Sequence, residues 1–377
     1  IKESRSNTGV EGVGIYLLNV CIELNRLNIP YLVLYNAKDL LYQKMLDSSV
    51  NVRIVDLPSG SIKNLINRRE KVKEIRNVIS NIVSKEEITH VNTHFPHLLN
   101  YITPDINIPI IAHWHGAFID NNPLKYFYLK DIFNIRTVIN NAYKKKYVFN
   151  FDRASSVVCP GVAAKNTAVN HFQVSEKKIR INPYGIHKID TNQYVNIKKD
   201  LGFSDTDKVI LSVGRETKSK GVEDFCEVAR AFNDRDDVKF VFAGGFRDEI
   251  YHDYLINKYG KNVTFLGMRT DVFNLYKSSD VFLFLSHRES AGLVLAEAMS
   301  FGLPLITWDI IGVNEMYEDG VQGRMEAFGD LTAIIEDIND ILNNKELYSS
   351  LSVASFEKSK QHLIQESVKN LITIFNN

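Results

Sequence analysis

The twenty residues DVFLFLSHRESAGLVLAEAM, at positions 280–299, indicate the fold of this chain most directly. The first six form a short apolar run of the kind that makes a buried strand, and residues from about 291 to 301 have the apolar spacing of a helix. A buried strand that passes into a helix is half of a βαβ unit, from which parallel sheets are built. The turn between strand and helix would lie at the carboxyl end of the strand, where open α/β sheets bind ligands.

The same alternation of short apolar runs and helix-period stretches extends along the chain. We expect strands at 30–36, 51–56, 88–93, 108–114, 155–159 and 179–183 in the first half. We expect further strands at 208–213, 238–243, 263–266, 280–285 and 303–307. Helices are expected at 14–28, 61–84, 123–149, 161–172, 220–233, 247–258, 291–301 and 330–344, with a helical tail over 346–376. The pattern predicts an α/β protein with parallel sheets.

Two sets of such units predict two Rossmann-like, doubly wound domains that face each other across a cleft. A length of 377 residues also favours two domains. We place the N-terminal domain at 1–185 and the C-terminal domain at 186–360, with a polar linker over 187–206.

Composition excludes several classes of protein. With 45% hydrophobic and 24% charged residues the chain is not disordered. No stretch approaches the ~18 uninterrupted apolar residues of a membrane-spanning helix. The first residues show no apolar segment of a secretory signal, and because the sequence begins without Met we expect residues upstream of Ile1. Three widely separated cysteines are typical of a reducing compartment.

The neutral net charge conceals an asymmetry between the two halves. Overall, 45 Lys and Arg balance 45 Asp and Glu, whereas nucleic-acid-binding domains usually carry a basic excess. Residues 1–185 hold 24 Lys and Arg against 15 Asp and Glu, an excess of nine positive charges. Residues 186–377 hold the remaining 21 against 30, an excess of nine negative charges. This asymmetry indicates that the two halves meet different partners.

The turn at 286–292 combines a helix N-terminus with carboxylates. The helix expected from about Ala291 would direct its unpaired N–H groups at a phosphate or diphosphate. Glu289 precedes this helix and Glu297 lies within it. A carboxylate can accept two hydrogen bonds, which suits a vicinal diol. A ligand with a central diphosphate and a polyol at each end, such as a nucleotide sugar, would fit. The alternative is that both glutamates are solvated charges favoured by the helix dipole.

A second strand-to-helix turn, SVGRETKSKGV at 212–222, carries two cations. Arg215 and Lys220 lie five residues apart, and both suit a diphosphate, one as a planar fork and one as a point charge. The turn is not a Walker A loop. The alternative is that it is a solvated basic turn.

These two turns resemble those of GT-B glycosyltransferases of family 4, a family that includes bacterial surface-polysaccharide transferases. The matching pieces follow one another in order over about residues 208–325. They are Val213-Gly214-Arg215 with Lys220-Gly221, Val241–Gly245, Val263–Gly267, Ser279–Phe282, the Glu-x7-Glu pair Glu289 and Glu297, Gly302–Ile306, and Gly312–Glu315 with Asp319-Gly320.

The resemblance implies a role for each matching residue. Arg215 and Lys220 would bind the donor diphosphate and Glu297 the ribose hydroxyls. Glu289 and the backbone of Ser290, Ala291, Gly292, Leu293 and Val294 would lie beside the donor sugar, and Met268 and Arg269 beside the base. The final helix, about 361–377, would pack back onto the first domain.

The first half carries a weaker match. Gly9-Val10-Glu11-Gly12-Val13-Gly14 opens a helix without the GxGxxG spacing of a dinucleotide site. In the family such a turn lies beneath the donor phosphates and the acceptor, which implies that role for Gly12 and Gly14. Alternatively, the glycines only permit a tight entry into the helix.

A histidine follows the strand at 108–114, in His113-Trp114-His115-Gly116. The family often has a His-Gly here whose histidine faces the transferring sugar, which implies a catalytic role for His115 together with Glu289, Arg215 and Lys220. A hydrogen-bonded structural histidine is the alternative. His94 and His97 follow another strand, and with His113 and His115 they could suggest a metal. Spacing alone is a weak indication, and the resemblance implies a fold that generally needs no metal, so we expect no metal site and no cofactor.

The positive excess is concentrated at 123–153, where aromatic residues and cations interleave at helical spacing and Lys144-Lys145-Lys146 follow. Residues 68–73 form a second basic patch. The segment is either a helix with aromatics in the core and lysines in water or a surface that meets anionic lipid or a lipid-diphosphate acceptor. RNA is a weaker alternative and we expect no nucleic acid, because no nucleic-acid-binding module is recognisable.

The resemblance therefore implies a retaining glycosyltransferase (EC 2.4) that moves a sugar from a nucleotide sugar, with UDP favoured, to an acceptor hydroxyl. The expected process is bacterial surface polysaccharide or glycolipid synthesis, with a glycan or lipid-linked acceptor. The expected place is the cytoplasm, with peripheral attachment to the inner face of the membrane as a further expectation. Two alternatives stay open: a nucleotide-sugar epimerase of the same fold, and a non-catalytic subunit that binds nucleotide sugars.

Overall fold

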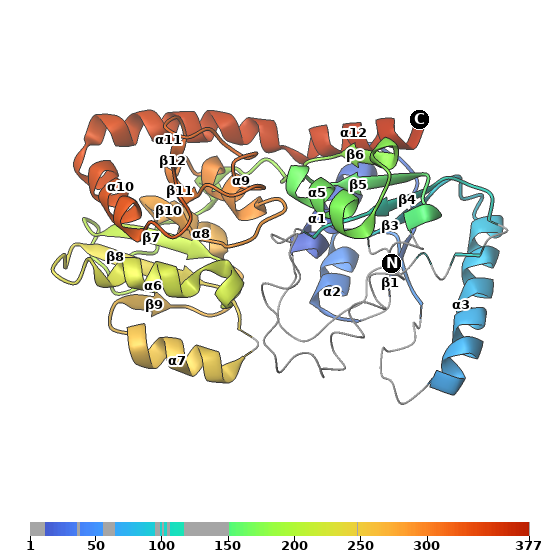
Figure 1. The fold of residues 1–377 in the computed structure, drawn as a ribbon, viewed down its shortest axis with the longest axis horizontal. Coiled ribbons are helices and arrows are strands. Elements are labelled where there is room, and N and C mark those ends of the chain that lie inside the picture. The colour runs from blue at the N-terminus through green and yellow to red at the C-terminus, as the bar shows by residue number, and fades with distance from the viewer. Residues whose placement is uncertain are drawn as a thin grey trace. The chain divides into compact units, whose positions relative to one another are not determined.

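The computed structural model describes residues 12–35, 38–55, 65–94, 99, 102–103, 106–116, 151–246 and 248–376. The chain divides into two compact units, Ile1–Pro183 with Ser367–Asn377, and Tyr184–Glu366 (Figure 1). Both are mixed α/β structures with parallel sheets, as the alternating pattern predicted.

Unit 1 alternates strands and helices. Its elements are α1 (Gly12–Arg26), β1 (Val33–Tyr35), α2 (Leu40–Asp47), β2 (Val52–Ile54), α3 (Leu65–Lys85), β3 (Val91–Thr93), β4 (Ile110–His113), β5 (Ser156–Cys159), α5 (Val162–Phe172), the 3-10 helix η4 (Glu176–Lys178) and β6 (Ile179–Ile181). Strands β1 and β2 pair in parallel, and β3 to β6 form a parallel sheet in sequential order. All six predicted strands of this half are present.

Helix α2 was not predicted, because it is short and only two of its residues are buried. Its buried residues are Leu41 and Met45, one helical turn apart. The Asp39 side chain caps it by accepting a hydrogen bond from the Tyr42 N–H at 3.0 Å.

Unit 2 contains one larger parallel sheet. Its elements are the 3-10 helix η5 (Thr191–Gln193), β7 (Lys208–Val213), the 3-10 helix η6 (Lys218–Lys220), α6 (Val222–Arg230), β8 (Val238–Ala243), α7 (Glu249–Tyr259), β9 (Val263–Phe265), α8 (Val272–Lys277), β10 (Val281–Phe284), α9 (Leu293–Ser300), β11 (Leu305–Trp308), β12 (Gly323–Glu326), α10 (Leu331–Asn343), α11 (Lys345–Ser359) and the 3-10 helix η7 (Lys360–His362). The strand order is β12-β11-β10-β7-β8-β9.

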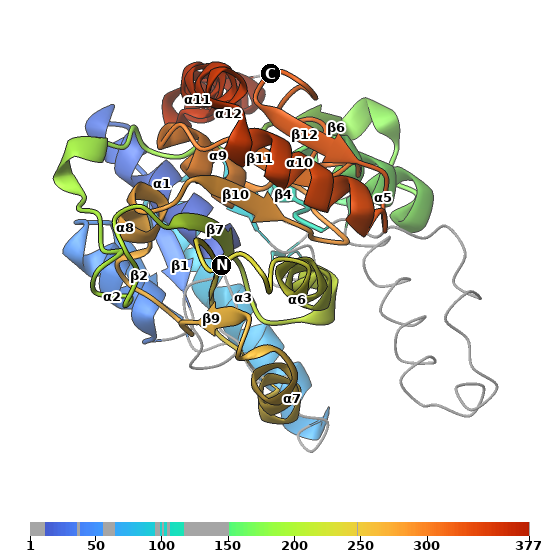
Figure 2. The same ribbon diagram turned by 90° about the vertical axis from the view of Figure 1, so that its left-hand side faces the viewer.

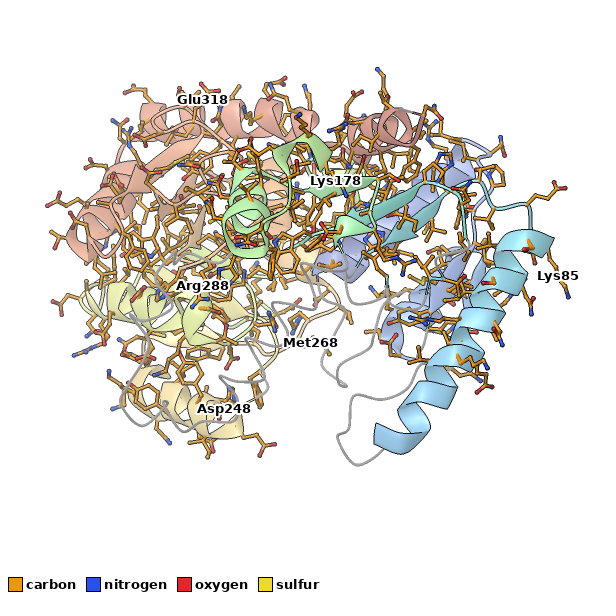
Figure 3. The ribbon with its side chains drawn as sticks, turned by 45° about the vertical axis from the view of Figure 1, so that its right-hand side comes forward. Lys85, Lys178, Asp248, Met268, Arg288 and Glu318 are labelled. Atoms are coloured by element: carbon orange, nitrogen blue, oxygen red, sulfur yellow. The ribbon has the colours of Figure 1, made fainter. Side chains whose placement is uncertain are left out.

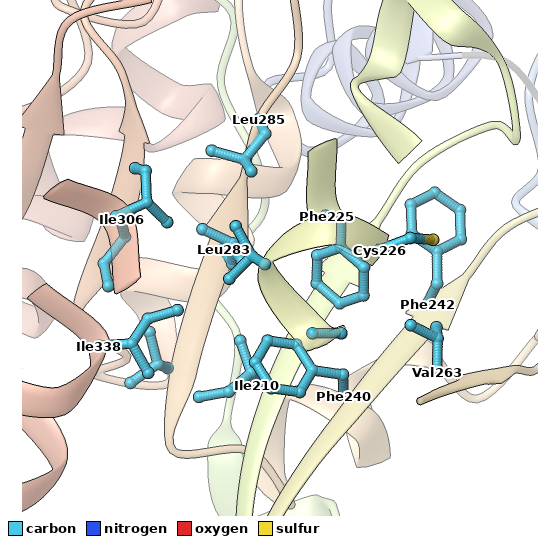
Figure 4. Close-up of a cluster of buried hydrophobic side chains, with 14 of the residues drawn as sticks. Ile210, Phe225, Cys226, Phe240, Phe242, Val263, Leu283, Leu285, Ile306 and Ile338 are labelled. Atoms are coloured by element: carbon cyan, nitrogen blue, oxygen red, sulfur yellow. The ribbon is translucent and has the colours of Figure 1, made fainter. Parts of the chain in front are cut away.

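Helices cover both faces of this sheet, which explains why its inner strands are largely apolar. Figure 2 shows α6 and α10 on one side and α8 and α9 on the other. On the first side, buried side chains of α6 and α10 such as Phe225 and Ile338 meet Ile210, Leu283 and Ile306 of the strands (Figure 4). The edge strand β12 was not predicted, because its sequence Gly-Arg-Met-Glu is largely polar and only Gly323 is buried.

The last helix, α12 (Ile364–Asn376), begins in unit 2, and its residues from Ser367 onward belong to unit 1. The Ser367 hydroxyl lies 3.2 Å from the Tyr16 hydroxyl of α1, and the Asn370 amide donates to the Ile181 carbonyl at 3.1 Å. These hydrogen bonds fasten the helix to α1 and β6.

Several sequence expectations concern residues outside those described. They include Gly9–Glu11, His97 and nearly all of the segment 123–153, with Lys144–Lys146. Cys21, Cys159 and Cys226 are buried free thiols. Among the helices of the described ranges, none combines the length and apolarity needed to cross a bilayer.

Candidate functional site

The strand order of unit 2 indicates which edge of the sheet is a candidate ligand site. From β7 the chain proceeds outward to β8 and β9, then returns to place β10 on the other side of β7 and continues outward to β11. Such a reversal between neighbouring parallel strands is where open α/β sheets bind ligands, beyond the carboxyl ends of the strands. The loops that leave β7 and β10 carry Arg215, Lys220 and Glu289. The topology therefore brings the two predicted turns together.

The loops at this edge are fastened to one another through their backbones. The Gly214 N–H donates to the Ala243 carbonyl at 3.0 Å, and the Gly244 N–H donates to the Gly267 carbonyl at 2.8 Å. The Glu216 N–H donates to the Gly245 carbonyl at 3.0 Å. The cationic turn after β7 is therefore held by the turns after β8 and β9.

Glycine is required at two of these positions. Gly221 has φ +63°, and a Cβ there would lie 1.8 Å from the Leu285 carbonyl oxygen. A Cβ on Gly244 would lie 1.6 Å from the Gly214 carbonyl oxygen. Any side chain at either position would displace the backbone of a neighbouring strand end.

Lys220 and Glu289, predicted from separate turns, form an ion pair. The Lys220 Nζ lies 2.7 Å from the Glu289 Oε2, and their side chains are 22% and 13% exposed. The other carboxylate oxygen accepts a hydrogen bond from the Ser290 N–H at 3.0 Å. The ammonium also lies 5.5 Å from the centre of the Phe284 ring. The pair holds a cation and a carboxylate at the reversal of the sheet.

The turn after β10 is fastened to the turn after β7 by contacts that the sequence did not indicate. The His287 N–H donates to the Ser219 carbonyl at 3.0 Å, and the Ser286 hydroxyl donates to the same carbonyl at 3.3 Å. The His287 Nε2 lies 2.7 Å from the Asp224 Oδ2 of α6. Arg288, on the same turn, is exposed (Figure 3).

Glu297 lies on α9 in an apolar setting. The Tyr276 hydroxyl of α8 donates to its Oε2 at 3.0 Å. Burial raises the pKa of Glu297 to about 7, although the hydrogen bond from Tyr276 acts in the opposite direction. Burial also raises the pKa of Tyr276 well above its usual range. Tyr276 was not predicted as a site residue, since no motif marks it.

The helix N-terminus beside these carboxylates begins slightly later than expected. Helix α9 starts at Leu293, with Gly292 as its N-cap. Gly292 and Leu293 are buried, whereas Ser290, Ala291 and Val294 are partly exposed. The residues expected to meet the donor sugar thus form the entry to α9.

The residues expected near the base lie on the turn after β9. The Met268 side chain is exposed (Figure 3). The Arg269 guanidinium binds both carboxylate oxygens of Asp271 at 2.7 Å, so its charge is already paired. Arg215, on the turn after β7, is exposed.

A buried carboxylate next to Arg215 was not predicted from the sequence. The Glu216 Oε2 lies 2.6 Å from the Nδ1 of His252 on α7, and the Glu216 side chain is fully buried. The Phe246 ring stacks on His252 with centroids 3.8 Å apart. This contact ties the cationic turn to α7.

In unit 1 the glycine-bearing helix and His115 come together. Gly12 is exposed at the start of α1 and Gly14 is buried. Tyr16, two residues further, lies edge-on to His94 and His115 with ring centroids 6.4 and 6.5 Å away. Its hydroxyl accepts a hydrogen bond from the Asn182 amide at 3.0 Å.

His94, His113 and His115 gather at the carboxyl ends of β3 and β4. The His94 Nδ1 lies 3.2 Å from the His115 Nε2. The His113 ring stacks on His94 at 4.4 Å and on His115 at 5.5 Å. Burial lowers the pKa of His113 to about 3, so this imidazole is neutral at physiological pH.

Comparison with known families matches both halves of the chain. Residues 194–358 match the family described as "Glycosyl transferases group 1". Residues 10–188 match the family described as "Glycosyltransferase Family 4". The two matches lie in order and together cover most of the chain.

Three curated relatives carry glycosyltransferase or synthase names. The N-acetyl-alpha-D-glucosaminyl L-malate synthase of Bacillus anthracis is 27% identical over 54% of this chain, and the match spans 56% of that relative's length. The alpha-galactosylglucosyldiacylglycerol synthase of Streptococcus pneumoniae is 24% identical over 81% of this chain and 83% of its own. The UDP-Gal:alpha-D-GlcNAc-diphosphoundecaprenol alpha-1,3-galactosyltransferase of Escherichia coli is 25% identical over 73% of this chain and 72% of its own.

Solved structures with the same fold cover nearly the whole chain. A glycosyltransferase from Rickettsia africae has a TM-score of 0.80 at 16% identity, over 97% of this chain and 94% of that one. HepE of Anabaena, solved in complex with UDP-glucose, has a TM-score of 0.76 at 16% identity, over 98% of this chain and 97% of that one. At these identities the likeness concerns the fold alone.

Proposed function

The chain belongs to the family 4-like glycosyltransferases of the GT-B fold, and on this premise we propose that it transfers a sugar from a UDP-sugar to an acceptor hydroxyl with retention at the anomeric carbon. The proposal rests mainly on one observation: Lys220, Glu289 and the N-terminus of α9 lie together beyond β7 and β10, where the strand order of unit 2 reverses. A cation, a carboxylate and a helix N-terminus at one sheet edge suit a diphosphate joined to a sugar.

The proposed donor contacts follow from the chemistry of each group. Arg215 and Lys220 bind the diphosphate, and Glu297 accepts hydrogen bonds from the ribose hydroxyls. Glu289 and the backbone from Ser290 to Val294 bind the sugar, and the turn with Met268 and Arg269 lies beside the base. The Glu289 carboxylate pairs with the Lys220 ammonium at 2.7 Å. A bound diphosphate would compete for that ammonium and leave the carboxylate for the sugar hydroxyls.

In the proposed reaction the bond between the anomeric carbon and the diphosphate oxygen breaks, and a bond from that carbon to the acceptor oxygen forms on the same face. The acceptor proton passes to the departing diphosphate. Arg215, Lys220 and the N-terminus of α9 stabilise the negative charge that develops on the diphosphate. These groups supply positive charge from the protein, so the proposed transfer needs no metal and no other cofactor.

Unit 1 is the proposed acceptor-binding part, with His115 beside the transferring sugar and Gly12 and Gly14 at the entry to α1. Relatives named for a diacylglycerol synthase and for a diphosphoundecaprenol transferase support a glycolipid or lipid-linked glycan as acceptor. We propose that the enzyme acts at the inner face of the membrane, in polysaccharide or glycolipid synthesis. The basic segment 123–153 is the part proposed to contact anionic lipid. Residues 186–360 form the proposed donor domain.

A screen of nucleotide sugars tests the proposal. Thermal shift and calorimetry with UDP-, GDP- and ADP-sugars should give binding to UDP-sugars. With an acceptor present, the protein should release UDP and form a glycosylated product. UDP-sugar binding with a changed sugar but no acceptor requirement would indicate the epimerase alternative. Binding with no UDP release in the presence of any lipid-linked or glycan acceptor would indicate the non-catalytic alternative.

A further inference from the structure

Three histidines of unit 1 meet because of the register of the sheet. Thr93 of β3 pairs with Ala112 of β4, so His94 and His113 follow at neighbouring positions on adjacent parallel strands. His115 lies two residues beyond His113, and alternate residues of an extended chain point to the same side. All three imidazoles therefore lie on one side of the sheet at its carboxyl edge. The expectation of no metal site rested on the weak spacing of the histidines along the sequence and on the family resemblance, and neither reveals this register.

The distances between the imidazoles are close to those of a shared ligand. One ring nitrogen from each of His94, His113 and His115 lies within 4.8 Å of the other two. Two nitrogens bound to one tetrahedral ion at 2.0–2.1 Å are separated by about 3.4 Å. The His94 Nδ1 and His115 Nε2 already lie 3.2 Å apart. The nitrogen of His113 lies within 4.8 Å of a nitrogen of each of the other two rings, so binding one ion would draw the three imidazoles closer together.

His113 supplies a second and independent observation. Its side chain is almost completely buried, with 1% of its surface exposed. The Nε2 atom is inaccessible to solvent and finds no hydrogen-bond partner within the part of the chain that the structure describes. A buried polar atom without a partner is unfavourable, and a bound ion is one way in which a protein satisfies such an atom.

We propose that His94, His113 and His115 bind a divalent transition-metal ion, with Zn²⁺ as the preferred ion, through one nitrogen each. Three imidazoles suit zinc, and three protein ligands leave a fourth position open for water or a ligand. Three neutral ligands leave the ion with its full double charge, so the open position suits an anionic or oxygen ligand.

The bound ion would regulate the proposed transfer, and this consequence rests on the proposed function of His115. A nitrogen of His115 that ligates zinc cannot contact the transferring sugar. Zinc should therefore lower turnover, and a chelator should restore it. Binding and inhibition are separate measurements, so a failure of the site and a failure of the role of His115 give different results.

Metal titration of the intact, untagged chain tests the site. After treatment with a chelator, Co²⁺ should bind at one equivalent with visible absorption bands typical of nitrogen ligands, and Zn²⁺ should displace it. His94→Asn, His113→Asn and His115→Asn should each weaken Zn²⁺ binding at least tenfold by calorimetry. His90→Asn is the matched control, because His90 lies just before β3, at its opposite end, and should leave the affinity unchanged. Circular dichroism checks the fold of each variant.

His113 is deeply buried, so its replacement can unfold the protein. In that case the Zn²⁺ affinities of His94→Asn and His115→Asn test the site. Loss of binding in both of these folded variants, with His90→Asn unaffected, supports the site. The absence of stoichiometric Co²⁺ binding overturns it, as does equal affinity in wild type and His94→Asn. A water molecule as the only occupant of the site would give that same negative result. Binding without inhibition would support the site and remove His115 from the reaction.

Discussion

Replacing Glu297 by Gln should stabilise unit 2, and the gain should grow as the pH rises. In the unfolded chain this carboxyl ionises near its ordinary pKa of 4.5, whereas burial raises the pKa of Glu297 to about 7 in the folded protein. Between these values the folded protein holds a proton that the unfolded chain has lost. The free energy of unfolding therefore falls as the pH rises from about 4.5 to about 7, and it stays at the lower level above that. Gln carries no such dependence.

The expected magnitude follows from the two pKa values. Each pH unit between them is worth about 1.4 kcal/mol, so the full loss in the wild type is about 3 kcal/mol. This is an upper bound, because the Glu297 residue keeps some exposed surface. At pH 5.5 only about 1.4 kcal/mol of the loss has accumulated. The difference between Glu297→Gln and wild type should therefore increase by up to about 2 kcal/mol between pH 5.5 and pH 8.

Urea unfolding followed by the fluorescence of Trp308 measures this difference. Trp308 is completely buried in unit 2, whereas the second tryptophan, Trp114, belongs to unit 1. A Trp114→Phe background therefore restricts the signal to the unit that contains Glu297. Glu336→Gln, an exposed position on α10 of the same unit, is the control and should show little change between the two pH values. An equal effect of Glu297→Gln at pH 5.5 and pH 8 would refute the reasoning.

Three further predictions concern activity and binding. Lys220→Ala should lower turnover more than tenfold, equivalent to over ~1.4 kcal/mol in the transition state. The control is Lys218→Ala, which should change turnover little because the Lys218 side chain is 79% exposed. Steady-state kinetics with a UDP-sugar checks both variants, and full activity in Lys220→Ala would contradict the donor site. The hydrogen bond from Tyr276 lowers the pKa of Glu297, so Tyr276→Phe should raise that pKa and move the pH midpoint of UDP binding upward relative to wild type. Calorimetry between pH 6 and pH 9 measures the midpoint, and an unchanged midpoint would indicate that Glu297 does not bind the nucleotide. Changing Lys144–Lys146 to Gln should reduce sedimentation with anionic liposomes, and unchanged sedimentation would favour lysines that only face water.

Most of the fold could be predicted, because buried parallel strands leave a clear signal in the sequence. Strands β7 and β8 begin and end at the predicted residues, since both consist of apolar runs bounded by polar turns. Strand β12 escaped prediction because an edge strand can be polar, and α2 because two buried residues make too short a pattern. Those elements depend on tertiary contacts that a local window does not contain.

The candidate site could be predicted only where a motif marks it. Glu289 and Lys220 were identified separately, and their ion pair follows from the adjacency of β7 and β10. Tyr276, His252 and Glu216 were missed, because their roles depend on which helix lies beside which strand end. The histidine cluster was not predicted as a metal site, because the spacing was a weak indication and the resemblance implied no metal; its nitrogens converge only through the register of β3 with β4.

A calorimetric titration with UDP, of wild type and of Glu297→Ala, tests the central claim that the carboxyl edge of unit 2 binds the nucleotide donor. We expect wild type to bind UDP and Glu297→Ala to bind at least tenfold more weakly, because the ribose hydroxyls lose their acceptor. Glu336→Ala should bind as wild type does. Equal affinity of wild type and Glu297→Ala would contradict the account.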